Sequence, residues 1–225
     1  MVDTKHHLIV AHEVTNVGHD RDQLARMAKL AKEATAADRL IALADRGYYE
    51  GYEILACERA GVAAVLPKPM TSNNAAAGLF DKRDFVYDGK TDTYRCPAGS
   101  IAIHRMTLEE AGKIQHKYWS SDCPRCAMKL HRTNSKERRI SRWEHEDMLD
   151  VVQERIDGAP EAMTLRRQTV EHVFGTLKAW MGSNHFLTKT LPRVGTEMSL
   201  QVLAYNLKRA IKILGAGSLM AAMKA

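Results

Sequence analysis

Two short apolar runs separated by a helical pattern constrain the fold of this chain more than any other feature. The first run, Leu40–Ala44, is continuous, as expected of a strand covered on both faces, and Val62–Leu66 is a second run of the same length. Between them, Ile54 and Leu55 belong to a helical pattern that Gly61 is suited to end. This strand–helix–strand order predicts parallel pairing and therefore an α/β sheet.

Periodicity and capping residues predict the other elements. We expect a strand at 6–15, a helix at 21–34 capped by Asp20, a hairpin at 85–94, a helix at 141–157 and a last helix capped by Thr196. The residues of the last helix expected to form a core stripe are Leu200, Leu203, Leu207, Ala210, Ile211 and Leu214. Residues 216–225 are rich in small side chains, which predicts a loosely ordered, flexible tail.

Asp45 is the first candidate site residue, because it directly follows the apolar run at 40–44 and precedes Gly47. An acid at the end of a buried strand lies at the edge of the sheet where ligands of open α/β folds bind. The alternative is that Asp45 only caps a turn, as many strand-terminal Asp residues do.

Glu171 is the second candidate, in the segment RQTVEHVFGTLK at 167–178. The helical spacing predicts one apolar stripe made of Val170, Phe174, Leu177 and Met181. Arg167, Glu171 and Lys178 then lie along one border of that stripe, which places a carboxylate between two cations at the edge of the core. Such a position suits a metal-binding or acid/base carboxylate. The alternative is an ordinary amphipathic helix with one Arg–Glu pair, worth a few tenths of a kcal/mol.

The basic charge of the chain is concentrated in one segment. The net charge is +6, and residues 113–142 contain nine Lys and Arg against two Asp and Glu, so the rest of the chain is close to neutral. Such a segment indicates a polyanionic partner such as nucleic acid, the alternative being a solvated surface. The cations expected to contact DNA phosphate in its densest part, 129–142, are Lys136, Arg138, Arg139 and Arg142.

Cysteine usage and the absence of apolar segments indicate the compartment. The four Cys come without a secretory signal pattern, which indicates a reducing cytoplasm and thiols available for metal. No apolar run approaches the roughly 18 residues that cross a membrane. Cys96 lies 27 residues before the Cys123–Cys126 pair, which makes three of the four ligands of a tetrahedral zinc site. His131 is the candidate fourth ligand, ahead of His104 and His116.

These motifs resemble those of DDE transposases from bacterial insertion sequences. The spacing of Arg167, Glu171 and Lys178 matches the signature around the last catalytic acid, although Thr164 stands where that signature usually has Tyr. The run from 166 to 208 is similar to one large subgroup of the family, and Ala44–Tyr48 resembles the motif of the second acid. The resemblance extends from about His7 to Gly215.

The resemblance implies an RNase H-like fold, a mixed sheet with flanking helices. The core would comprise residues 1–70 and 160–215, interrupted by an insertion at 71–159 that carries the Cys residues and the basic stretch. In that fold three carboxylates hold two Mg²⁺ or Mn²⁺ ions, and Asp45 and Glu171 are two of them. The implied activity is DNA cleavage and strand transfer at insertion-sequence ends, on double-stranded DNA, by a homodimer. Relatives carry a further zinc-ligating Cys at the position of Arg132.

The first acid of the family has no counterpart here. It lies on a strand that precedes the one matched by His7–Val14, whereas the acids at Asp3, Glu13 and Asp20 do not match its motif. We therefore expect the C-terminal portion of a transposase, incomplete at its N-terminus and inactive unless a separate N-terminal polypeptide complements it. It would be cytoplasmic and nucleoid-associated. The alternative is a non-catalytic, zinc-stabilised DNA-binding protein derived from a transposase.

Overall fold

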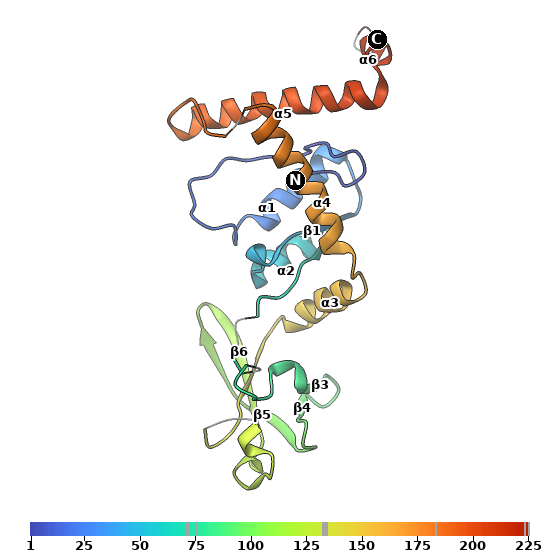
Figure 1. Ribbon diagram of the computed structural model, residues 1–225. Coiled ribbons are helices and arrows are strands. Elements are labelled where there is room, and N and C mark those ends of the chain that lie inside the picture. Colours follow the sequence, from blue (N-terminus) through green and yellow to red (C-terminus); the bar gives the residue numbers. More distant parts are fainter. Residues whose placement is uncertain (71–72, 75, 132–134, 183, 223, 225) are drawn as a thin grey trace. The chain divides into compact units, whose positions relative to one another are not determined.

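The structure, a computed structural model, describes residues 1–70, 73–74, 76–131, 135–182, 184–222 and 224. The chain forms two compact units (Figure 1). The first unit consists of Met1–Pro69 together with Met148–Ala225, and the second is Met70–Asp147.

The first unit contains the predicted strand–helix–strand. Strands β1 (Leu40–Leu43) and β2 (Val62–Val65) pair in parallel, and α2 (Gly51–Arg59) connects them, so this prediction is confirmed. Side chains alternate between the faces of a strand, and Ile41 is 69% exposed while Ala42 is buried. The expectation that β1 is covered on both faces is therefore wrong.

The N-terminal residues differ from the expected strand at 6–15. An isolated antiparallel bridge joins Val2 to Ile9, and the backbone of Ile9 pairs with a side chain, because Asn206 accepts from its N–H at 2.9 Å and donates to its carbonyl at 2.8 Å. The helix predicted at 21–34 is confirmed as α1 (Leu24–Thr35), but it begins after Gln23 and Asp20 does not cap it.

The C-terminal half of the first unit is helical. Its elements are α3 (Glu146–Asp157), α4 (Ala162–Gly175), a π-helical turn (Thr176–Trp180), α5 (Leu191–Leu214) and α6 (Ala216–Ala222). Helix α3 begins later than predicted because the residues before it form a strand. Thr196 does not cap α5 but lies inside it, where its hydroxyl donates to the carbonyl of Pro192. A helix, α6, occupies most of the predicted tail.

One core cluster of the first unit joins the N-terminal segment to α4 and α5. Its buried members are Ile9, Val173, Leu177, Val202 and Tyr205. The stripe predicted for α5 is wrong: Leu200, Leu203 and Leu207 are exposed, and the buried face lies on the other side of the helix.

The second unit is built on a five-stranded antiparallel sheet with the order β3-β4-β5-β6-β7. Its strands are β3 (Val86–Asp88), β4 (Thr93–Arg95), β5 (Ile101–Glu110), β6 (Lys113–Trp119) and β7 (Ile140–Trp143). The β3–β4 hairpin was predicted and is confirmed, whereas β5, β6 and β7 were not expected. Its core cluster consists of Phe85, Tyr94, Cys96, Ala102, Tyr118 and Ile140.

Candidate active site and nucleic-acid interface

Asp45 lies directly after β1, where the chain enters the 3-10 helix Arg46–Tyr48. Its Oδ1 accepts a hydrogen bond from the backbone N–H of Gly47 at 2.9 Å, and its Oδ2 accepts one from Arg166 of α4 at 2.6 Å. A Cβ at position 47 would lie 3.0 Å from Asp45 Oδ1, so this turn favours glycine. Asp45 thus caps the turn and also ties the end of β1 to α4.

Tyr48 shows which other charges lie near Asp45. Burial raises the pKa of the Tyr48 phenol, and the carboxylates of Asp20 and Asp45 raise it further, whereas Arg166 lowers it. Asp20 therefore belongs to the surroundings of Asp45, although the two acids are 25 positions apart in the sequence.

Glu171 lies in α4, a helix that contacts β1. The buried side of α4 and of the turn after it runs through Thr169, Val173 and Leu177. Of the predicted stripe, Leu177 is buried and Met181 packs against the core, whereas Phe174 is exposed, so the prediction is wrong at Phe174. Thr169 can join this face because its hydroxyl donates to the carbonyl of Leu165 at 2.8 Å. Glu171 is exposed on the side away from the buried face, and not at the edge of the core as predicted.

The cation that pairs with an acid in this region is Arg166, which the sequence analysis did not select. Arg166 precedes Val173 by seven residues, about two helical turns, and therefore lies on the same side of α4. A cation on the buried side of a helix is expected to pair with an acid, and this position was the signal that could have identified Arg166. Arg167 and Lys178 are exposed, and the predicted pair between Arg167 and Glu171 is not among the ion pairs formed by the described residues. Lys178 Nζ lies 5.9 Å from the ring centroid of Phe174.

Asp45 and Glu171 are not oriented toward a common point. Arg166 and Glu171 are separated by about 140° around the axis of α4, because an α-helix has about 3.6 residues per turn. Since Arg166 is turned toward Asp45, Glu171 lies on another side of the helix. Within the part of the chain that the structure describes, no three His, Cys, Asp or Glu side chains are grouped so that they could hold a metal ion.

His172, which follows Glu171 in the sequence, forms a ring pair with His7 that was also missed. The rings of His7 and His172 meet edge to face, with centroids 5.0 Å apart. The backbone of His7 is in the left-handed region, with φ 56°. Burial, followed by the charges of His172 and Arg209, lowers the pKa of His7, and Asp3 acts in the opposite direction.

The three cysteine residues of the second unit form no disulfide. Cys96 and Cys123 are buried and Cys126 is half-buried. His131 is exposed at the end of a 3-10 turn. The structure does not bring three of these candidate zinc ligands together, nor does it group His104 and His116 with them. Arg132, the position of the additional Cys in relatives, lies outside the described residues.

The predicted DNA-contacting cations of the second unit fall into two groups. Lys136 and Arg139 are exposed, and Arg139 also pairs with Glu137 at 2.9 Å. Arg142 is only 8% exposed: its guanidinium lies 3.8 Å from the ring centroid of Tyr87 and donates to the hydroxyl of Tyr94 at 3.5 Å. Arg142 is therefore part of the packing of the sheet and is not available to phosphate. Arg138 is half-buried, near the ring of Phe85.

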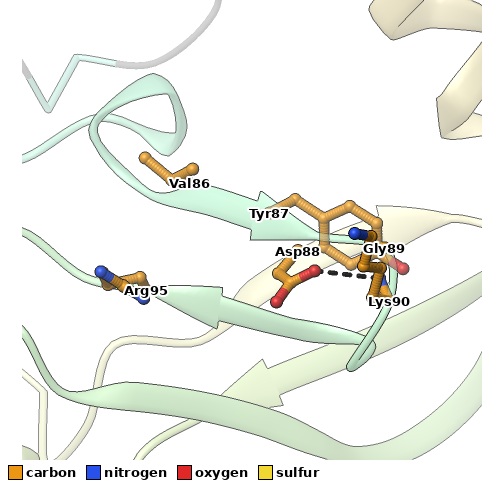
Figure 2. A pocket seen from close by; sticks show the side chains of 6 residues that line it. All are labelled: Val86, Tyr87, Asp88, Gly89, Lys90 and Arg95. Atoms are coloured by element: carbon orange, nitrogen blue, oxygen red, sulfur yellow. Dashed lines mark hydrogen bonds between the residues drawn. The ribbon is translucent and has the colours of Figure 1, made fainter.

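A hollow of about 600 Å³ lies at the β3–β4 hairpin (Figure 2). It is lined by Val86, Tyr87, Asp88, Gly89, Lys90 and Arg95. Two cations and an aromatic ring therefore line it together with one acid. The backbone N–H of Lys90, the hydroxyl of Thr91 and the charge of Arg95 lower the pKa of Asp88, so this acid stays ionised in the hollow. Its negative charge offsets one of the two cations.

Comparison with known proteins decides the family. The family model described as "Transposase DDE domain" matches residues 95–211, which is more than half of the chain. The chain belongs to the transposase DDE domain family. Neither the curated proteins nor the solved structures include a match.

The family match assigns the general role of the chain and leaves its details open. Members of the transposase DDE domain family act on DNA and generally use divalent metal ions. The matched stretch includes Glu171 and most of the second unit, whereas Asp45 lies outside it. Among the described residues, the helices are too short or too polar for any of them to cross a membrane.

Proposed function

We propose that this chain is the part of an insertion-sequence transposase that carries the second and third catalytic acids, Asp45 and Glu171, on an RNase H-like core. Its substrate would be double-stranded DNA at the ends of the element, and the reactions would be cleavage and strand transfer. The observation that supports this most is the family match, which includes Glu171 within the stretch 95–211. The parallel β1–β2 pair, with Asp45 at its end and α4 beside it, fits the same proposal.

The metal ions of the family are Mg²⁺ or Mn²⁺ in this proposal, and the described residues do not by themselves fit them. Both oxygens of Asp45 already accept hydrogen bonds, from Gly47 and Arg166, and Glu171 lies on another side of α4. Two-ion catalysis requires several carboxylates around one point. We therefore expect the chain alone not to cleave DNA. A separate N-terminal polypeptide would supply the first acid, and a homodimer would be the active form.

The experiment is a strand-nicking assay on supercoiled plasmid that carries the element's ends, with Mg²⁺ or Mn²⁺. The chain is tested alone and mixed with the polypeptide encoded upstream. We expect nicking only in the mixture, and we expect Glu171→Gln and Asp45→Asn to abolish it. Glu161→Gln is the matched control, because it makes the same charge change at an exposed position at the start of α4. Nicking by the chain alone would contradict the proposal, and Asp20→Asn would then test the acid near Tyr48.

DNA contact by the second unit is the other part of the proposal. Lys136 and Arg139 are the exposed cations there that we expect to contact phosphate. Arg167 on α4 and Lys178 in the π-helical turn after it are further expected contacts. Each phosphate contact that is lost lowers the dependence of log affinity on log salt by about one. The double variant Lys136→Ala/Arg139→Ala should therefore bind all DNA duplexes more weakly. The slope of its log affinity against log salt concentration should be smaller by about two. Lys29→Ala, exposed on α1, is the control.

A non-catalytic DNA-binding protein is the second candidate function. The observation that favours it is that the second unit has a core of its own and exposed cations, independent of Asp45 and Glu171. In this case the chain still binds DNA, but it does not nick the plasmid either alone or mixed with the upstream polypeptide. The proposal that zinc stabilises this unit is tested by measuring zinc content. Stoichiometric zinc lost in Cys123→Ser would support it, and a zinc-free protein with full DNA affinity would contradict it.

A further inference from the structure

Helix α5 has two apolar faces, and one of them is exposed. On the first face Met198, Val202 and Tyr205 pack into the core of the first unit. The side chains of the second face, named here the outer stripe, are exposed to 41–63%: Leu200, Leu203, Leu207, Ile211 and Leu214. At 100° per residue, the outer stripe lies nearly opposite Val202 and Tyr205. A helix that is apolar on opposite sides is normally enclosed on both.

We propose that the outer stripe is the contact between two copies of this chain, with the two α5 helices antiparallel and crossing at Leu207. This inference deepens the homodimer of the proposed function. Its tests use neither DNA nor metal, so its failure is distinguishable from a failure to cleave.

The spacing of the outer stripe is the argument for a second copy. Successive members are separated by three, four, four and three positions, from Leu200 to Leu214. This series is the same in both directions. An antiparallel partner therefore places its Leu214 opposite Leu200, its Ile211 opposite Leu203 and its Leu207 opposite Leu207. A two-fold interface requires exactly this kind of self-complementary surface, in which one patch meets itself.

The charges of α5 also fit an apolar partner. The outer stripe and the residues within it, Ala204 and Ala210, carry no charge, so two copies would bury no unpaired ion. Lys212 lies on another side of the helix, and Lys208 lies at the border, where a long side chain can extend into water. Because the outer stripe contains no cation, it does not suit binding to DNA phosphate.

The area of the outer stripe is close to the minimum that a specific interface needs. The stripe extends for about 21 Å along the helix, since the rise is about 1.5 Å per residue. Its apolar surface is on the order of 500 Å², in the upper part of the range for the largest apolar patch of a monomer. Two such stripes together bury about 1,000 Å², which is the total area that a specific interface should reach.

The first test is the oligomeric state of the full chain by sedimentation velocity over a range of concentrations. We expect a dimer, and we expect Leu207→Glu to weaken it at least 100-fold, because two carboxylates would face each other at the centre. Leu187→Glu is the matched control, since it places the same charge on an exposed Leu in the loop before α5 and should leave the dimer intact. Leu207→Ala, which adds no charge, should weaken the dimer less.

Either of two results would overturn the inference. One is a wild-type chain that stays monomeric up to about 100 µM, in which case the second unit or another polypeptide covers α5. The other is a dimer that Leu207→Glu, folded by circular dichroism, leaves unchanged.

The second test concerns orientation, with a bismaleimide that spans about 8 Å, close to the distance between packed helix axes. In a Cys126→Ser background, Leu207→Cys should crosslink with itself. Leu200→Cys should not, because the two copies of residue 200 lie about 21 Å apart in an antiparallel pair, but it should crosslink to Leu214→Cys in a mixture. Self-crosslinking of Leu200→Cys as efficient as that of Leu207→Cys would show a parallel pair and overturn the antiparallel arrangement.

Discussion

The two units of the chain differ in how their side chains are paired and covered. In the second unit the hydroxyls of Tyr118 and Tyr87 both donate to Asp92, at 2.6 and 2.8 Å, and Arg142 packs on the ring of Tyr87. Tyr94 fills the space between them, with ring centroids about 5 Å from the other two. The hydroxyls of all three tyrosines therefore have hydrogen-bond partners within the unit.

The first unit leaves more of its apolar surface uncovered. One side of α5 and the Ile41 side of β1 are exposed, and the N-terminal segment is held by the side chain of Asn206 and not by a strand. From this comparison we expect that the second unit can fold by itself around its own core, whereas the first unit exposes apolar surfaces that a partner could cover. The following predictions test this difference.

The largest effect is expected at Tyr118, which is 1% exposed in the second unit. Tyr118→Ala removes a ring from the core and a donor from Asp92, so the free energy of unfolding of this unit should fall by about 3–5 kcal/mol. Hydrogen exchange measured on peptides of the full chain reports each unit separately. Protection should be lost in β4, β5 and β6 and kept in α1 and α2.

The control for this prediction is Tyr118→Phe, which keeps the ring and removes only the donor. Because Tyr87 still donates to Asp92, the cost should be about 1–2 kcal/mol. Equal loss of protection in α1 and α2 would show that the two units fold as one, and the comparison would then be wrong.

The second prediction concerns Asn206, the link between α5 and the N-terminal segment. Asn206→Ala leaves the N–H and carbonyl of Ile9 without their partner, which should cost about 1–3 kcal/mol. Exchange of the Ile9 amide measures this directly and should accelerate by one to two orders of magnitude. Gln201→Ala, half-buried on the same helix, should change it little. Unchanged protection at Ile9 would mean that another group holds this segment.

The fold of the first unit was largely predictable where local pattern decides it. The apolar runs at 40–44 and 62–66 and the helical spacing between them gave β1, α2 and β2, because each pattern matches one element. The five-stranded sheet was predictable only in its β3–β4 hairpin. Strand β5 is mostly exposed, β6 is mostly half-buried, and polar residues interrupt both, so their pairing depends on partners that local periodicity does not reveal.

The position of Asp45 in the fold was predictable, and the surroundings of Glu171 were less so. The turn after a buried strand placed Asp45 correctly at the end of β1. The apolar stripe predicted around Glu171 was wrong at Phe174, which is exposed, whereas Thr169 is buried and bonds its own hydroxyl to the helix backbone. The same problem affected α5, where the more apolar face is the exposed one. Hydrophobicity identifies faces that can be buried, and the partner that buries each one is a property of the tertiary structure.

The third prediction is a pH dependence of the first unit that arises at His7. Because the pKa of His7 is lowered in the folded state, the unfolded chain binds more protons just below the ordinary histidine pKa of 6.5. The contribution of His7 to the free energy of unfolding is therefore fully present above pH 6.5. It falls as the pH drops through 6.5 and stops falling below the lowered pKa of His7. The charges that face His7 are His172, Arg209 and Asp3, so chemical denaturation should be compared between wild type and His7→Gln. An identical pH profile for the two would exclude His7 as the source.

The smallest effect is expected at Arg166, and a second ion pair of the first unit provides the comparison. Arg155 donates to both oxygens of Glu58, whose side chain is only 14% exposed, whereas Arg166 contacts one oxygen of Asp45, whose side chain is 43% exposed. Solvent screens the second pair more strongly, so Arg166→Ala should lower the free energy of unfolding by less than about 1 kcal/mol. Arg155→Ala should cost more, about 1–3 kcal/mol, because it leaves a largely buried carboxylate unpaired. Urea denaturation of the two variants measures both values. A larger loss at Arg166 would mean that Asp45 is held mainly by α4 and not by its own turn, and the end of β1 would then depend on the helix that carries Glu171.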